Sequence, residues 1–227
     1  MSGMERWLLF LLAMAPGFLW LYYFYSKDRY DPEPVVWVLG IFLLGATVTV
    51  PVAVLEGVLG AVAGGILAAV VVAPVCEEIA KFFVVKKTVY RSRVFDEPVD
   101  GIIYAAAAGL GFATIENILY VFSAFDESLL LALQTGLVRG LISVPGHVLF
   151  SVMWGSALGM ARFMPEQEGS ALVRNGLVLA MAAHSLFNLL LFSAVGFALL
   201  VLVLVPALWM LTERHIRHAV AHSLFKK

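Results

Sequence analysis

The sequence predicts an all-α protein: a bundle of helices that crosses a lipid bilayer about seven times and forms a single transmembrane domain over residues 1–227. Of the 227 residues, 62% are hydrophobic and only 14% are charged. This is more apolar surface than one soluble core of that size encloses, so the bilayer must solvate most of the chain. The apolar residues also occur in runs of roughly 20, the length that spans the hydrocarbon core.

The first run, residues 7–25, is too long for a signal peptide and lacks a small-x-small cleavage site, so we interpret it as a retained span. The fifth run is longer than one crossing and contains Pro145-Gly146 after Arg139, which predicts a short broken or re-entrant piece before its main helix. The tail, residues 213–227, is predicted to form a short surface helix in the cytoplasm. The expected spans are residues 7–25, 35–55, 58–85, 101–122, 129–161, 171–192 and 194–211.

The positions of the basic residues predict the orientation in the cell membrane, because Lys and Arg are retained on the cytoplasmic side. With seven spans, nearly all basic clusters fall on one side, and the opposite side receives only Arg6. This places the N-terminus outside the cell and the C-terminus in the cytoplasm. The net charge of −1 and the small size of each cluster argue against a nucleic-acid partner. The clustered residues are Lys27, Arg29, Lys86, Lys87, Arg91, Arg93, Arg162, Arg174, Arg214, Arg217, Lys226 and Lys227.

Several ionisable side chains lie inside the predicted spans, where each costs a few kcal/mol and therefore needs a partner or a function. The helical spacing lets the ammonium of Lys81 sit beside either Glu77 or Glu78. An internal ion network that only fixes packing would account for these three residues. The local excess of carboxylates favours a catalytic role instead, because neighbouring carboxylates raise the pKa of one of them, which can then accept a proton. Other ionisable residues inside the predicted spans are Glu116, Arg139, His147 and His184, and the polar Asn188 lies one helical turn after His184.

These residues come from four spans but are predicted to lie at one depth. At about 1.5 Å per residue, Glu77, Glu116, His147 and His184 fall roughly 20 to 22 Å from the cytoplasmic ends of their spans. One layer of the membrane, nearer its outer face, could therefore hold all four side chains.

This layer offers the groups that peptide hydrolysis requires. We interpret Glu77, with Glu78 as its coupled partner, as the base that activates water. His184 and Asn188, one helical turn apart, would bind or polarise the scissile carbonyl, and Lys81 would balance charge. The sequence does not decide whether a metal takes part. Cys76 is disfavoured as a nucleophile because an apolar environment suppresses the thiolate.

The alternative with a metal makes Glu116, His147 and His184 the ligands of a zinc ion, since two histidines and one glutamate suit a catalytic zinc with an open position. The histidines lack the close His-x-x-x-His spacing of many zinc sites, so a metal-free glutamate mechanism stays open. Either histidine alone would also be explained as a satisfied buried imidazole.

The ordered set of motifs resembles the PrsW family of intramembrane proteases over residues 25–190, within a protease-like core of residues 25–192. More distantly, it is similar to the CAAX prenyl protease and bacteriocin-processing superfamily, although Glu116 stands where that pattern has a histidine. The resemblance implies a bacterial regulatory protease whose partner is a transmembrane substrate, an anti-sigma factor that receives its first cut during envelope stress. The motifs are Asp28-Arg29-Tyr30-Asp31-Pro32-Glu33-Pro34, Glu77-Glu78-x-x-Lys81, Phe112-x-x-x-Glu116, a histidine after Arg139 and Pro145-Gly146, and His184-x-x-x-Asn188.

Two other classes of protein are compatible with buried charges. An ion-coupled transporter also uses intramembrane Glu, Lys and His, but it commonly carries inverted repeats, and we find no convincing repeat between the two halves. The ionisable groups also converge on one layer instead of forming a relay across the bilayer. An inactive scaffold would leave the buried charges as a cost without a function.

Overall fold

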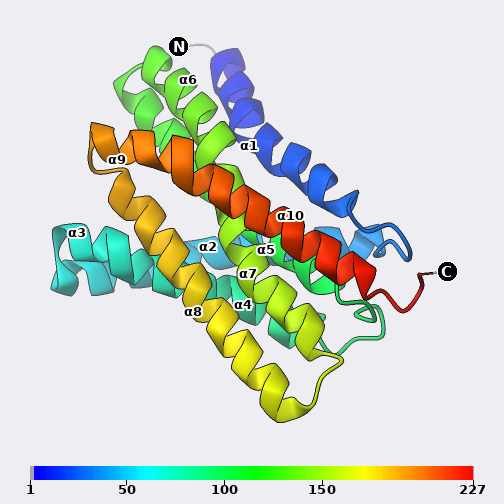
Figure 1. Cartoon of the computed structure of the whole chain (residues 1–227). Helices are drawn as coiled ribbons and strands as arrows, with labels where there is room; N and C mark the ends of the chain where they lie inside the picture. The colour runs from blue at the N-terminus through cyan, green and yellow to red at the C-terminus, as the bar shows by residue number, and fades with distance from the viewer. Residues whose placement is uncertain (1–2, 227) are drawn as a thin grey trace.

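The computed structural model describes residues 3–226, and this part of the chain consists of helices joined by short turns, with no strand (Figure 1). The predicted all-α bundle is therefore confirmed. The α-helices are α1 (Gly3–Tyr25), α2 (Val35–Ala63), α3 (Gly65–Leu67), α4 (Ala73–Thr88), α5 (Asp100–Glu127), α6 (Leu129–Val138), α7 (Val144–Ala161), α8 (Glu166–Leu190), α9 (Ala194–Leu199) and α10 (Val205–Ala221).

In the described part of the chain, three π-helical segments join shorter helices into long ones: η1 (Ala68–Val72), η2 (Arg139–Ser143) and η3 (Leu200–Leu204). Each is followed two residues later by a proline: Pro74, Pro145 and Pro206. A proline inside an α-helix has no N–H to donate, and its ring collides with the carbonyl four residues earlier. In all three cases that carbonyl lies within the π-helical segment, where the wider turn accommodates the ring.

Within residues 3–226, six helical runs are long and apolar enough to cross a membrane. A further run from Gly65 to Thr88 is of similar length but carries Glu77, Glu78 and Lys81 near its middle. The outward faces of the bundle are rich in exposed leucine and valine, as contact with lipid requires. The described helices are thus consistent with a multi-pass membrane protein.

Two details differ from the sequence-based expectation. The interruption in the fifth run is the π-helical segment η2, and the helix continues from α6 into α7 without a loop, so the chain does not re-enter there. The reason is that π geometry absorbs Pro145 without breaking the helix. The tail is not a separate surface helix either, because α10 continues through residues 213–221 as the end of the last span.

Helix α5 lies at the centre of the bundle and packs against α1, α2, α6 and α7. Residues 105–108 on it are four consecutive alanines with no exposed surface. Its contact with α7 is a backbone contact, since a Cβ atom at Gly101 would collide with the backbone of Gly155 and Gly159. A Cβ at Gly111 would likewise collide with the carbonyl of Phe42 on α2. The small-xxx-small spacing of Gly155 and Gly159 is typical of membrane helices that pack closely, and this approach fixes α5 and α7 relative to each other.

The turns after α1, α4 and α7 and the end of α10 lie at one end of the bundle, and the turns after α2 and α8 lie at the other (Figure 1). Basic residues gather at the first end. Lys86, Arg91 and Arg174 line one surface depression there, and Lys27, Arg29 and Lys226 line another. We call this end the basic face.

Candidate active site

Glu77, Glu78 and Lys81 occupy one face of α4 because they are three and four residues apart along a helix. The Lys81 ammonium is fully buried and donates to Oε2 of Glu77 at 2.9 Å and to Oε1 of Glu78 at 2.9 Å. Its third close partner is Nδ1 of His147 on α7, also at 2.9 Å. The ammonium therefore lies between two carboxylates and an imidazole.

The two glutamates have different surroundings. Glu78 has no exposed surface, and both of its oxygens are occupied. Its Oε1 lies 3.2 Å from Nδ1 of His184, and its Oε2 accepts from Ser151 Oγ at 3.1 Å and from Trp154 Nε1 at 3.0 Å. Glu77 instead lines the cavity described below. The sequence analysis treated the two glutamates as one coupled pair. In the structure, Glu77 faces the cavity and Glu78 is enclosed by protein.

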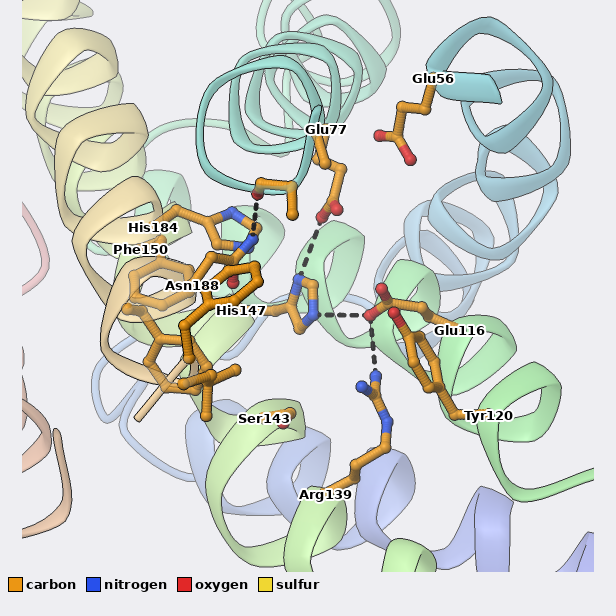
Figure 2. A pocket seen from close by; sticks show the side chains of 15 residues that line it. Glu56, Glu77, Glu116, Tyr120, Arg139, Ser143, His147, Phe150, His184 and Asn188 are labelled. Atoms are coloured by element: carbon orange, nitrogen blue, oxygen red, sulfur yellow. Dashed lines mark hydrogen bonds and ion pairs between the residues drawn. The ribbon is translucent and has the colours of Figure 1, made fainter. Parts of the chain in front are cut away.

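His147 lies between carboxylates from two helices (Figure 2). Its Nδ1 is 3.5 Å from Oε2 of Glu77, and its Nε2 is 2.9 Å from Oε2 of Glu116 on α5. Arg139, from the π-helical segment η2, donates from Nη2 to the same Glu116 oxygen at 2.9 Å and from Nε to Oδ1 of Asn117 at 3.2 Å. Glu116 is therefore held by an imidazole and a guanidinium.

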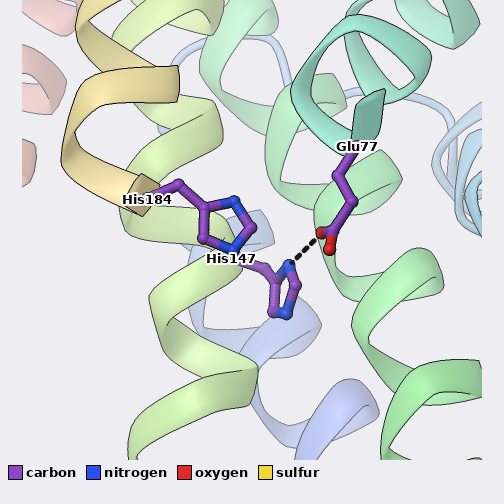
Figure 3. Close-up of side chains that lie close together, drawn as sticks. All are labelled: Glu77, His147 and His184. Atoms are coloured by element: carbon purple, nitrogen blue, oxygen red, sulfur yellow. Dashed lines mark ion pairs between the residues drawn. The ribbon is translucent and has the colours of Figure 1, made fainter. Parts of the chain in front are cut away.

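Glu77, His147 and His184 come together as a group that can hold a metal ion (Figure 3). One donor atom from each lies within 4.8 Å of the other two. The sequence-based set had Glu116 in place of Glu77, and the geometry does not favour that set, because Glu116 lies at the Nε2 side of His147. Helix-depth arithmetic gives the height of a residue but not the direction in which its side chain points, which explains the difference.

The donor set fits a catalytic metal of the zinc type, for which two histidines and one carboxylate are typical ligands. Each histidine has one ring nitrogen on a second carboxylate, His147 on Glu116 and His184 on Glu78. Histidines that bind metals are usually oriented in this way.

The balance of charged groups also favours a bound metal ion. Carboxyl groups outnumber cations here, since Glu56, Glu77, Glu78 and Glu116 share only Lys81 and Arg139, and a bound metal ion would compensate this excess.

A cavity of about 270 Å³ opens beside this group, with polar and apolar side chains on its walls (Figure 2). His184 stacks on Phe150 at the wall, with ring centroids 4.5 Å apart. Two further lining residues lie in the turn after α8, at the end of the bundle opposite the basic face. The lining residues are Glu56, Ala69, Ala73, Glu77, Glu116, Tyr120, Arg139, Ser143, His147, Phe150, His184, Phe187, Asn188, Leu191 and Phe192.

Sequence reasoning missed Glu56 and Tyr120. Glu56 lies on α2, lines the cavity, and has a buried Oε1 without a hydrogen-bond partner among the described residues. The rule that singled out Glu77 would have found Glu56, but the expected spans ended at residue 55 and placed it in a loop. The Arg139 guanidinium lies over the ring of Tyr120, with Cζ 3.9 Å from the ring centroid. Nothing in the sequence indicates this contact.

Asn188 lines the cavity, but its amide is already engaged. Its Nδ2 donates to the carbonyl oxygen of Ala69 at 2.9 Å. Ala69 belongs to the π-helical segment η1, so this bond ties α8 to the helix that carries Glu77. In the structure, Asn188 therefore links two helices one turn from His184. The sequence analysis had assigned it contact with the scissile carbonyl.

A helical membrane protein whose interior holds a Glu-His-His group beside a polar cavity has the arrangement that a membrane-embedded hydrolase requires. The sequence matches the PrsW family of intramembrane metalloproteases over residues 33–211, and the chain belongs to that family. The resemblance noted from the motifs is therefore confirmed, and the protein is a protease.

Curated relatives of similar length carry the name protease PrsW. The protein from Geobacillus kaustophilus is 36% identical over 214 residues, which cover 93% of this chain and 92% of the relative. The protein from Clostridioides difficile is 33% identical, with 95% and 92% covered, and that from Bacillus subtilis is 35% identical, with 79% and 80% covered. No solved structure matches the chain.

Proposed function

We propose that this protease is a metal-dependent endopeptidase that hydrolyses a peptide bond in a transmembrane protein substrate, and that Glu77, His147 and His184 hold the metal. The observation that carries the proposal is the grouping of these three side chains within 4.8 Å on the wall of an intramembrane cavity. A bound zinc ion would supply a water of lowered pKa and would polarise the scissile carbonyl.

The other residues of the site then have supporting roles. Glu78 orients His184 through its Nδ1, and Glu116 orients His147 through its Nε2. The Lys81 ammonium, which lies 2.9 Å from Nδ1 of His147 in this structure, would leave that nitrogen to the metal and stay paired with Glu78. Glu56 has a carboxylate oxygen free of protein partners, and Figure 2 shows its carboxylate facing the cavity opposite Glu116. We assign Glu56 the role of accepting a proton from the attacking water.

The alternative without a metal keeps Glu77 as the base that activates water, with Lys81 as its charge partner. It shares every residue with the first proposal and differs in one measurable respect, the effect of a chelator.

For the substrate, we propose a single-span regulatory protein of the anti-sigma factor type, cut near its extracytoplasmic membrane boundary. Two cavity residues, Leu191 and Phe192, lie in the turn after α8, opposite the basic face. If the basic face is cytoplasmic, as the distribution of Lys and Arg indicates, the cavity opens toward the outer side. The N-terminus then lies outside the cell and the C-terminus in the cytoplasm.

The test uses purified full-length protein reconstituted in liposomes with a single-span anti-sigma factor and, separately, with an unrelated single-span protein. Mass spectrometry of the products should show cleavage near the outer boundary by the parent and none by Glu77→Gln. Glu127→Gln, an exposed glutamate at the end of α5, is the matched control and should cleave like the parent. Cleavage by Glu77→Gln would reject the site. Equal cleavage of both substrates would reject the substrate assignment alone.

A further inference from the structure

A second group of carboxylates is buried at the basic face, far along the helices from the cavity. Asp28 and Glu33 come from the turn between α1 and α2, Glu97 from the loop before α5, and Asp100 from the first residue of α5. None of the four side chains is more than 5% exposed. One donor atom from each of Asp28, Glu97 and Asp100 lies within 4.8 Å of the other two.

Each of these carboxylates has one oxygen bonded to the protein and one oxygen without a partner. Asp28 Oδ2 accepts from the Glu33 backbone at 3.1 Å, and Asp100 Oδ2 accepts from the Glu97 backbone at 2.6 Å. Glu97 Oε1 accepts from the Ser223 hydroxyl and Glu33 Oε2 from the Tyr104 hydroxyl. The second oxygens are all buried, and none has a hydrogen-bond partner within residues 3–226: Asp28 Oδ1, Glu33 Oε1, Glu97 Oε2 and Asp100 Oδ1.

The group also lacks a counter-charge. Within residues 3–226, no Lys or Arg forms an ion pair with any of the four carboxylates, although Lys27, Arg29 and Lys226 lie on the same face. Burial, followed by the charges of Asp28, Asp31 and Asp96, raises the pKa of Glu97 to about 7. Burial, followed by the charges of Asp31 and Asp96, raises the pKa of Asp28 to about 6. A buried oxygen without a hydrogen-bond partner is destabilising, and more so when it is charged. Four together are costly unless a cation compensates.

We propose that Asp28, Glu97 and Asp100 bind a hard divalent cation of the Mg²⁺ or Ca²⁺ type, with Glu33 as a fourth carboxylate beside Asp100. An all-oxygen donor set without histidine or cysteine selects these ions over zinc. The site is separate from the cavity, which is lined by none of these residues.

Bound there, the ion joins three segments that are distant in sequence: the turn after α1, the start of α5, and the C-terminal segment through Ser223. It stabilises the basic face by fixing the ends of α1, α5 and α10 relative to one another. Because α5 carries Glu116, the ion secures one wall of the cavity from a distance.

The test is isothermal titration of the purified, chelator-treated full chain with MgCl₂ and, separately, CaCl₂, together with the melting temperature at each concentration. The parent should bind one of the two ions at about one site per chain with millimolar or better affinity, and its melting temperature should rise. The ion that binds more tightly identifies the occupant.

Three variants locate the site. Asp100→Asn should bind at least about tenfold more weakly, because a charged ligand is lost. Asp126→Asn, an exposed aspartate near the other end of α5, should bind like the parent, and so should His147→Ala, which disrupts only the cavity site. If Asp100→Asn does not fold, Glu97→Gln replaces it. Absence of binding by the parent, or binding that survives in Asp100→Asn and Glu97→Gln but fails in His147→Ala, would overturn the proposal. The proposal would also be overturned if Asp100→Asn had a higher melting temperature than the parent and neither cation changed the melting temperature. That result is expected if the carboxylates share protons.

Discussion

Nε2 of His147 lies 2.9 Å from Oε2 of Glu116, so a carboxylate on α5 determines which nitrogen of a histidine on α7 faces Glu77. Removing the charge by Glu116→Gln should therefore weaken metal binding and activity by about 10- to 100-fold without abolishing either. Metal content and initial rates measure this. A loss as complete as that of Glu77→Gln would instead make Glu116 a ligand, as in the zinc alternative considered from the sequence.

Glu78→Gln should act mainly on stability. The change leaves the buried Lys81 ammonium with one fewer carboxylate, and breaking a buried pair costs about 3 to 5 kcal/mol. The melting temperature of the detergent-solubilised variant should fall well below that of the parent. Ser151→Ala removes only one neutral donor to Glu78 and should cost about 1 kcal/mol. Equal melting temperatures for Glu78→Gln and the parent would contradict the positioning role.

A strong chelator should abolish proteolysis, and added zinc should restore it, if Glu77, His147 and His184 hold the catalytic metal. His147→Ala and His184→Ala should each lack bound metal by elemental analysis while remaining inserted in the membrane. Full activity in chelator, with no metal detected, would leave the mechanism in which Glu77 itself activates water.

Glu56→Gln should lower kcat by about 10²- to 10⁴-fold, the usual contribution of a general base, while metal content stays at the parental level. The amide keeps the shape of the side chain but cannot take the proton. Glu127→Gln again serves as the control. Loss of the metal together with activity would show that Glu56 supports the metal site instead.

The outer opening of the cavity is tested by cysteine labelling in a Cys76→Ala background. His184 lies six residues, or about 9 Å, from the end of α8 at Leu190, and about 27 Å from its start at Glu166. Leu191→Cys should therefore react with a membrane-impermeant thiol reagent added outside intact cells, and Arg91→Cys should react only after the cytoplasmic side is exposed. The reverse pattern would overturn the assigned orientation.

The sequence predicts the long helices and several residues of the candidate site, but not how the side chains of that site are arranged. Hydropathy predicts the long helices because a bilayer-spanning segment must be apolar over its whole length, and buried charges predict Glu77, His147 and His184 because each is costly in lipid. Hydropathy cannot show how helices rotate about their axes. The separation of Glu77 from Glu78, and the placement of Glu116 behind His147, depend on that rotation.

Glu56 shows a second limit of the sequence. Its position near the end of α2 made it look like a loop residue, because Gly57 and Gly60 follow it and the apolar run could be divided there. In the structure α2 continues to Ala63, and the turn occurs at Gly64 and Gly65, where φ is +75° and +35°. The positive φ angles favour glycine, but the sequence contains 19 glycines and does not indicate which pair turns.

The π-helical segment η2 makes the active site sensitive to insertions and deletions. A turn closed by i→i+5 bonds holds one residue more than an α turn, so deleting Leu141 would restore ordinary α geometry. The π turn absorbs this extra residue, so the helices on either side would keep their faces. Arg139, which lies within the turn, would change its position relative to Glu116, and Pro145 would lose the wide turn that accommodates its ring. A change of a single residue in the length of this helix would thus disturb the Arg139–Glu116 contact while leaving both side chains in the sequence.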